Sequence, residues 1–127
     1  MEIRSLDRAG LKDDNGLRAQ RLMPWPALNA PFEGSWCVIR PGAASGPHHH
    51  HEHEIWVAVT GSAEIICDDR RVPFAAGDIA HFPPGTQHQV VNDGADPFEM
   101  YSVWWDAEMA ERFAARAGTD APPEDGA

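Results

Sequence analysis

Turn-forming residues divide this chain into short segments, and the segments between the turns are rich in β-branched and aromatic side chains. Pro41-Gly42, Gly61-Ser62 and Asn92-Asp93-Gly94 are three of these turns. The segments that we expect to be strands are 35–40, 53–59, 63–67, 72–74, 79–82, 88–91 and 98–105. Short strands separated by turns about every ten residues are typical of an all-β sandwich or barrel.

We expect one domain with short additions at both ends. At 127 residues, of which 43% are hydrophobic, the chain suits a single core. Asp106 is placed to N-cap a helix in which Met109, Phe113 and Ala117 recur at spacings of four residues. The predicted parts are an N-terminal segment packing on the barrel (1–34), the barrel (35–105), a short C-terminal helix (106–117) and a flexible tail or linker (118–127).

The charge balance excludes one class of partner. Acidic residues outnumber basic ones by 20 to 10, and the formal net charge of −10 repels a nucleic-acid backbone.

No apolar run is long enough for a transmembrane helix, so no membrane partner is expected. The first residues lack the apolar stretch of a signal peptide, which predicts a cytoplasmic protein. In that compartment Cys37 and Cys67 are expected to be buried free thiols, with a disulfide as the alternative.

Five of the seven histidines lie between Pro47 and Glu54, directly before a segment that is apolar enough to be a buried strand. Imidazole is the commonest metal ligand in proteins, and a carboxylate is its usual oxygen partner. Because side chains alternate along a strand, His48, His50 and Glu54 share one face. One strand cannot surround an ion, so a further ligand must come from elsewhere. His88 is the candidate, since it follows a Pro-Gly turn and begins another strand.

The other histidines of the run allow different ligand pairs. A shifted register would use His49 and His51, or His51 and His53, but neither pair has Glu54 at the same spacing. We expect these imidazoles to be exposed at the rim of a loop. Glu52 shares the parity of Glu54 and is either an alternative acceptor near the ion or a charge that faces solvent.

These two histidine-bearing segments resemble the two conserved motifs of the cupin superfamily. The first reads Gly42-(five residues)-His48-x-His50-(three residues)-Glu54-(six residues)-Gly61, and the second reads Gly77-(five residues)-Pro83-x-Gly85-(two residues)-His88-(three residues)-Asn92. All ten positions match, with 15 residues between the motifs. The resemblance covers residues 35–105 and is specific for the superfamily rather than for one reaction.

The resemblance implies a double-stranded β-helix barrel with a metal ion at its mouth. The implied ligands are His48, His50, Glu54 and His88. Zn or Fe is the expected ion, with Mn, Ni, Co or Cu as alternatives, because the ligand set suits all of them. Three imidazoles and one carboxylate leave positions open on a six-coordinate ion for water, dioxygen or a chelating substrate.

Further residues are candidates for roles around the ion. Glu54 could move a proton, and so could His81 if it faces inward. Arg40 could anchor a substrate carboxylate or pair with an acid at the surface. The other candidates for substrate binding are Trp36, Trp56 and Tyr101, of which Trp56 shares the parity of Glu54.

The function implied by the resemblance is that of a metal-dependent enzyme, of the oxygenase, isomerase or cyclase type, acting on a small polar metabolite that chelates the ion. The histidine-rich motif and the linker-like tail are also similar to the zinc-dependent cupin modules of hydrazine synthetases. Those modules rearrange an aminoacyl ester of an N-hydroxylated amine to form a nitrogen–nitrogen bond, and the chain would then be part of a larger ligase-containing protein. A non-catalytic small-molecule-binding or sensory cupin is the third alternative.

A homodimer is expected, since small cupins often associate through sheet edges.

Overall fold

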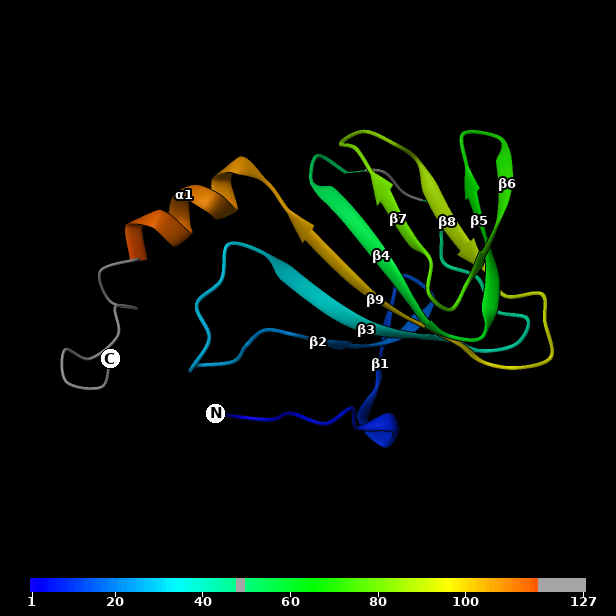
Figure 1. Ribbon diagram of the computed structural model, residues 1–127, viewed down its shortest axis with the longest axis horizontal. Helices are drawn as coiled ribbons and strands as arrows, with labels where there is room; N and C mark the ends of the chain where they lie inside the picture. The colour runs from blue at the N-terminus through cyan, green and yellow to red at the C-terminus, as the bar shows by residue number, and fades with distance from the viewer. Residues whose placement is uncertain (48–49, 117–127) are drawn as a thin grey trace.

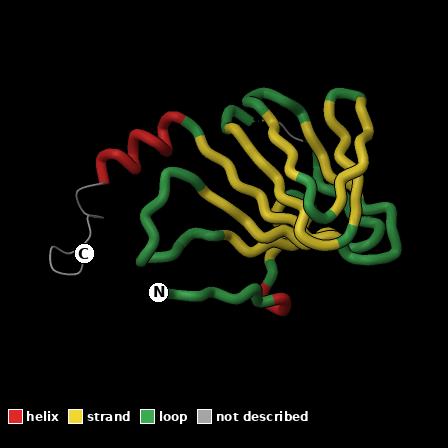
Figure 2. Tube along the Cα trace, in the orientation of Figure 1, coloured by secondary structure: helices red, strands yellow, loops and turns green. Residues whose placement is uncertain are grey.

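The computed structural model describes residues 1–47 and 50–116, and strands dominate this part of the chain (Figure 2). The strands are β1 (Lys12–Asp14), β2 (Leu17–Arg21), β3 (Glu33–Ile39), β4 (His53–Thr60), β5 (Ser62–Cys67), β6 (Arg70–Ala75), β7 (Ile79–Phe82), β8 (His88–Val91) and β9 (Phe98–Trp105). The helical elements are a 3-10 turn, η1 (Arg8–Gly10), and α1 (Ala107–Arg116). The seven predicted strands and the short helix are present, with small shifts at their ends, and residue 117 lies outside the described residues.

Within residues 1–47 and 50–116, nine strands form two antiparallel sheets, one with the order β1-β2-β3-β9-β4-β7 and one with the order β6-β5-β8. The sheets face each other, and α1 extends from the end of β9 beyond them (Figure 1). The chain passes from the first sheet to the second at Gly61, whose φ of 82° favours glycine. A Cβ there would meet the carbonyl oxygen of Pro97 at 2.6 Å. The predicted all-β double-stranded β-helix with a C-terminal helix is confirmed.

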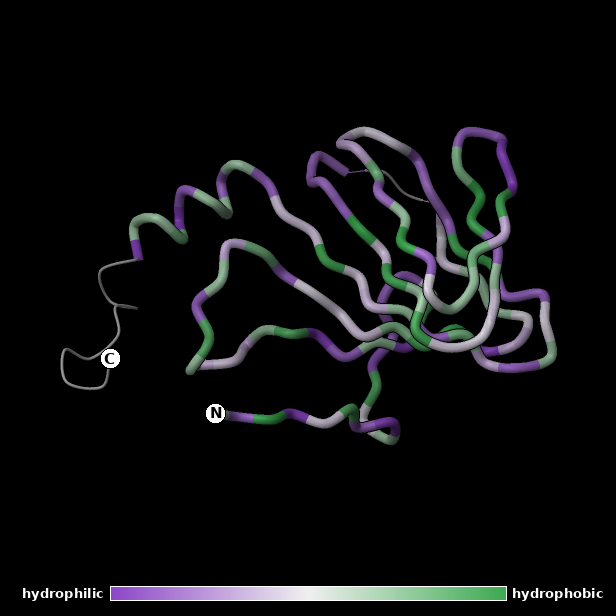
Figure 3. The backbone as a smooth tube through the Cα atoms, in the orientation of Figure 1, coloured by the Kyte–Doolittle hydropathy of each residue, from purple (hydrophilic) through white to green (hydrophobic). Residues whose placement is uncertain are grey.

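The core lies between the two sheets, because alternate residues of each strand face inward. Figure 3 shows hydrophobic stretches along several strands and a hydrophilic turn between β5 and β6. Fully buried side chains include Ile39, Val90, Phe98 and Met100. Cys37 is a buried free thiol as expected, whereas Cys67 is only partly buried.

The N-terminal segment adds two strands that the sequence pattern does not predict. β2 pairs with β3 from Arg18 opposite Val38 to Arg21 opposite Ser35, and β1 pairs with β2. β1 is short and polar, and in β2 only Leu17 and Ala19 are apolar and buried. Local propensity is therefore weak, and pairing with β3 supplies the missing stabilisation. In the described part of the chain, no helix has the length and apolar character that crossing a bilayer requires.

Candidate metal centre

Two histidines and one glutamate from separate parts of the chain meet between the sheets. Glu54 lies on β4, His50 on the loop that precedes it, and His88 at the start of β8. Oε1 of Glu54 is 2.7 Å from Nε2 of His88 and 3.3 Å from Nε2 of His50. One potential ligand atom from each residue lies within 4.8 Å of the others. His48, the further implied ligand, and His49 lie outside the described residues.

Glu54 is held as a carboxylate in a buried position. Only 7% of its surface is exposed, and the hydroxyl of Ser102 donates a hydrogen bond of 2.7 Å to Oε2. Burial opposes ionisation, but the hydrogen bonds from His88 and Ser102 and the charges of nearby histidines outweigh it. The pKa of Glu54 is therefore lowered from its ordinary value. The side chain is thus an anionic oxygen donor at neutral pH and a candidate metal ligand.

His88 is oriented by its backbone contact. Nδ1 lies 2.9 Å from the carbonyl oxygen of Thr86, and a carbonyl only accepts, so Nδ1 carries the proton. Nε2 then faces Oε1 of Glu54 at 2.7 Å, and a proton or a metal ion between the two atoms would stabilise this contact. A histidine whose Nδ1–H donates to a backbone carbonyl is the usual arrangement of a metal ligand.

Aromatic rings enclose this cluster. Phe82 stacks on His88 with ring centroids 4.3 Å apart, and Trp56 lies edge-on to the same imidazole at 5.2 Å. His88 is 1% exposed as a result. The donor set of imidazoles and carboxylate fits Fe, Mn, Co, Ni, Cu or Zn, and the apolar surroundings strengthen its attraction for a cation.

The cluster borders a cavity of about 280 Å³ on the inner face of the larger sheet. Its polar lining residues are Asp14, Asn15, Arg21, Ser35, Ser45, His50, Glu52, Glu54 and Ser102, and the others are Leu17, Cys37, Trp56, Met100 and Trp104. Glu52 lies 3.4 Å from Nδ1 of His50, so it contacts a candidate ligand from the side of the loop.

Burial raises the pKa of the Cys37 thiol to about 12, which keeps the thiol protonated.

The other histidines of the run lie away from the cluster. His51 is exposed, and its Nε2 lies 2.8 Å from a carboxylate oxygen of Asp106. His53 is half-buried, because its ring stacks between those of His81 and Trp105. His81 is exposed on β7, where Ala80 and Phe82 take the inward positions. A proton-transfer role for His81 required an inward direction, and its exposed position on β7 does not meet that condition.

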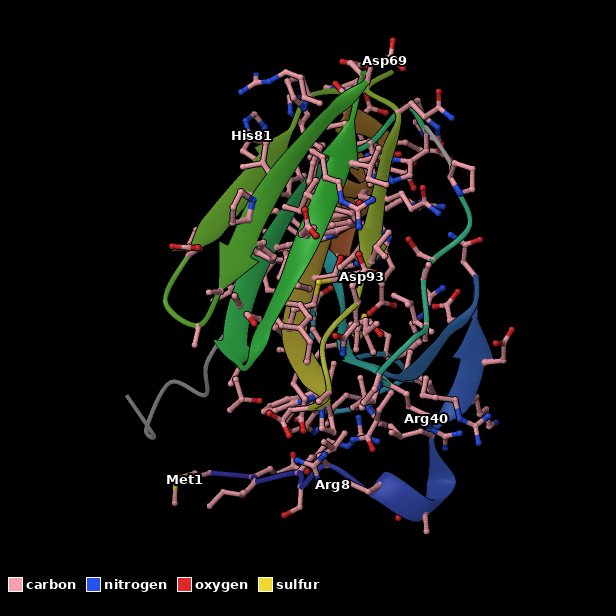
Figure 4. All side chains as sticks on the ribbon, turned by 90° about the vertical axis from the view of Figure 1, so that its right-hand side faces the viewer. Met1, Arg8, Arg40, Asp69, His81 and Asp93 are labelled. Atoms are coloured by element: carbon pink, nitrogen blue, oxygen red, sulfur yellow. The ribbon has the colours of Figure 1, made fainter. Side chains whose placement is uncertain are left out.

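Three of the four expected substrate-binding residues also lie outside the cavity. Ser35 and Cys37 face inward from β3, so Trp36 and Arg40 point outward. Tyr101 shares that outer face, where its ring meets the ring of Trp36 at 6.1 Å. Arg40 is exposed, and it lies at the opposite end of the barrel from His81 (Figure 4). Only Trp56 lines the cavity as expected.

The cavity is lined instead by residues that the sequence patterns do not single out. Arg21 and Asp14 come from the N-terminal strands, and Ser102 and Trp104 come from β9. Ser102 and Trp104 lie on the same face of β9, but no local sequence feature distinguishes that face from the one that carries Tyr101. The local sequence does not indicate that Arg21 and Asp14 line a cavity, because β1 and β2 are themselves not predicted from it.

This fold and its cluster define a class of small β-barrel proteins with imidazole and carboxylate groups gathered in the cavity. The chain belongs to the cupin family, since residues 35–104 match the family model for the cupin domain, Cupin_2. The resemblance seen in the two motifs is thereby confirmed.

Two solved structures are similar over nearly the whole chain. The Cupin 2 conserved barrel domain protein from Salinispora arenicola is 65% identical, with a TM-score of 0.89 over 91% of this chain and 98% of that one. The plu4264 protein from Photorhabdus luminescens is 34% identical, with a TM-score of 0.87 over 91% and 97%. The structural similarity thus extends beyond residues 35–104, the part that matches the family model.

Curated relatives are more distant and longer. The alginate biosynthesis protein AlgA of Pseudomonas aeruginosa is 26% identical over 107 residues, which are 80% of this chain and 22% of that protein. A mannose-1-phosphate guanylyltransferase of Sinorhizobium fredii is 26% identical over 87% of this chain and 24% of its own length. The chain spans about a fifth to a quarter of the length of these relatives.

Proposed function

We propose that this protein is a metal-dependent cupin enzyme acting on a small polar metabolite that chelates a divalent ion held by His48, His50, Glu54 and His88. The observation that carries the proposal is the convergence of His50, Glu54 and His88 beside the cavity. An oriented imidazole, an ionised carboxylate and an open cavity are what a catalytic metal site requires. A purely structural site would have no need of the cavity.

The described residues would divide the work around the ion. When bound, the ion would polarise a carbonyl or carboxylate of the substrate, or support oxygen chemistry if it is iron. Ser102 donates a hydrogen bond to Oε2 of Glu54, and Oε1 faces the histidines. The lowered pKa of Glu54 makes it a weak base, which favours a role as ligand over proton transfer. Trp56 and Phe82 exclude water from His88.

A second candidate substrate class comes from the curated relatives. Their names include alginate biosynthesis and mannose-1-phosphate guanylyltransferase, so a sugar or sugar phosphate chelating through its hydroxyls is the alternative. The relatives described above include no hydrazine synthetase, and the hypothesis of a hydrazine synthetase module gains no support from them.

The expected homodimer stays a prediction. β7 is an edge strand of the larger sheet, and its Ile79 is 69% exposed.

The test is elemental analysis of protein purified without nickel chromatography. We expect about one divalent ion per chain in the wild type, and its loss in His88→Ala and in the nearly isosteric Glu54→Gln. His81→Ala is the matched control, because it removes an exposed histidine outside the cavity and should keep the ion. Equal metal content in the wild type and both ligand variants, with folding verified by circular dichroism, would contradict the proposal.

The identity of the ion then directs the activity assays. Iron would favour oxygen consumption with candidate substrates, and zinc would favour isomerisation or cyclisation. Turnover of a chelating metabolite by the loaded wild type, absent from Glu54→Gln, is the expected result. Tight binding of metabolites without turnover would instead support the binding or sensory alternative.

A further inference from the structure

A single guanidinium faces the cavity. Arg21, on β2, is the only arginine or lysine among the described residues that line it. Its inward direction follows from parity, since Leu17 and Ala19 on the same face of β2 are buried. The guanidinium carbon lies 4.7 Å from the ring centroid of Trp104, another lining residue. The cavity thus has the candidate metal ligands in one part of its wall and a cation in another.

Two contacts hold this cation in place before any ligand arrives. Nε and Nη2 of Arg21 lie 3.1 and 3.0 Å from one oxygen, Oδ2 of Asp14. Trp104 supports the plane of the guanidinium by stacking. A guanidinium has five N–H donors, so contact with a single oxygen leaves donors for a second carboxylate. Half of the side chain is exposed, and a ligand in the cavity can therefore reach it.

Sheet register gives the separation between Arg21 and the cluster. Arg21 is opposite Ser35 on β3, and Ser35 is opposite Ser102 on β9, the residue that binds Glu54. Neighbouring strands are about 4.8 Å apart, so two steps across the sheet place the backbones of Arg21 and Ser102 about 10 Å apart. Side chains reach into the cavity from both positions, so a ligand that bridges them must be shorter than this, and with carbon–carbon bonds of about 1.5 Å that length corresponds to an acid of roughly four to six carbons.

Size and charge narrow the ligand further. A cavity of about 280 Å³ is at the small end of ligand pockets and favours a small metabolite over a nucleotide. At the Arg21 end Asp14 also lines the cavity, and its charge penalises a dianionic phosphate group there more than a single carboxylate group; the second carboxylate of a diacid would lie at the ion. Apolar walls from Trp56 and Met100 suit the methylene groups between two acidic ends.

We propose that Arg21 binds the distal carboxylate of a small dicarboxylic acid, or of its hydroxy or oxo derivative, whose other end chelates the ion held by the cluster. This inference rests on the proposed function and names its substrate class. Arg21 acts by positioning the acid across the cavity, and Asp14 and Trp104 act by orienting Arg21.

Calorimetric titration of zinc-loaded protein with succinate, glutarate and adipate tests the proposal, with propionate as the monoacid probe. For Arg21→Met, which keeps the length of the side chain and loses the charge, we expect at least tenfold weaker binding of the best diacid and unchanged binding of propionate. Arg18→Met is the matched control, because Arg18 lies on the same strand with the opposite parity, and it should bind like the wild type.

Three results would overturn the inference. These are no diacid binding by the zinc-loaded wild type, equal diacid affinity in Arg21→Met and wild type, and tighter binding of mannose 1-phosphate than of any diacid. Zinc content is measured for each variant. A wild type that takes up no ion refutes the proposed function and this inference together. Zinc-loaded wild type and Arg21→Met with the same diacid affinity refute the inference alone.

Discussion

Glu54 is the residue on which the candidate centre depends, and its neighbours explain why an acid can be buried there. One carboxylate oxygen faces His50 and His88, and the other accepts the hydroxyl of Ser102. A buried carboxylate without such partners would take up a proton. The sequence motif predicts Glu54 and both histidines. It says nothing of Ser102, because that serine is 48 residues away and meets Glu54 only through the pairing of β4 with β9.

Removing the Ser102 hydroxyl should weaken metal binding without removing a candidate ligand. We expect Ser102→Ala to raise the zinc dissociation constant about tenfold, because partners that orient metal ligands are typically worth 10- to 100-fold in affinity. Competition with a chromophoric chelator measures the constant.

Ser35→Ala is the control for this change. Ser35 is also a buried serine that lines the cavity, but its hydroxyl donates to the backbone oxygen of Gln20. It should bind zinc as the wild type does. If Ser102→Ala and Ser35→Ala share the wild-type dissociation constant, the orienting role of Ser102 is refuted.

Among the elements, β3 and β9 show how a strand can be predicted correctly while its faces are not. Both strands carry large apolar side chains on both faces: Cys37 and Met100 point inward, and Trp36 and Tyr101 point outward. The outer face is covered by the N-terminal segment, where Arg8 reaches Glu99. Alternation of apolar and polar residues is therefore absent, and parity cannot choose the inner face.

Asn92 joins three backbone segments at the end of β8. Its Nδ2 donates to the carbonyl oxygens of Ile39 and Asp96, each at 2.9 Å, and its Oδ1 accepts the N–H of Gly94 at 3.0 Å. The side chain is fully buried. These contacts give Asn92, the last residue of the second motif, a structural role.

Asn92→Ala should lower the free energy of unfolding by roughly 2–4 kcal/mol, because it removes three hydrogen bonds and leaves buried partners unsatisfied. Urea unfolding measures the loss. Asp93→Ala, in the same turn, changes an exposed side chain whose contact is a surface pair with Arg71, and little change is expected there. Equal losses in the two variants would show that the Asn92 contacts contribute no special stability.

For the molecule as a whole, the N-terminal segment is fastened across the larger sheet. Arg8 makes two hydrogen bonds to Glu99 on β9, at 2.6 and 3.0 Å, and the indole N–H of Trp36 donates to the same carboxylate at 2.9 Å. Figure 1 shows the first residues passing beneath β2. The hydrogen bond from Arg8 is the main reason why the pKa of Glu99 is lowered, against the effect of burial.

A lowered pKa makes this connection pH-dependent. The folded pKa of Glu99 lies below its ordinary 4.5, so its stabilisation is complete above that value and is lost as the pH falls through the folded pKa. We expect Glu99→Gln to melt at a lower temperature than the wild type at about pH 7, with a smaller difference at about pH 3. Thermal unfolding at both pH values checks this.

Glu111→Gln makes the same chemical change at an exposed position of α1 and should leave the melting temperature unchanged at both pH values. A Glu99→Gln difference of equal size at about pH 7 and pH 3 would refute the charge-dependent role.

Local chemistry in the sequence was enough to predict the barrel strands, the turns between them, the helix cap at Asp106 and the three described members of the candidate metal cluster. Each of these follows from short-range rules: period-two alternation, glycine at a positive φ, and ligand types at fixed spacing. Tertiary structure alone decided which faces of β3 and β9 look inward, that Arg21 and Ser102 share the cavity with Glu54, and that His81 and Arg40 do not. Those outcomes depend on pairing between strands far apart in the chain, and no local pattern contains that information.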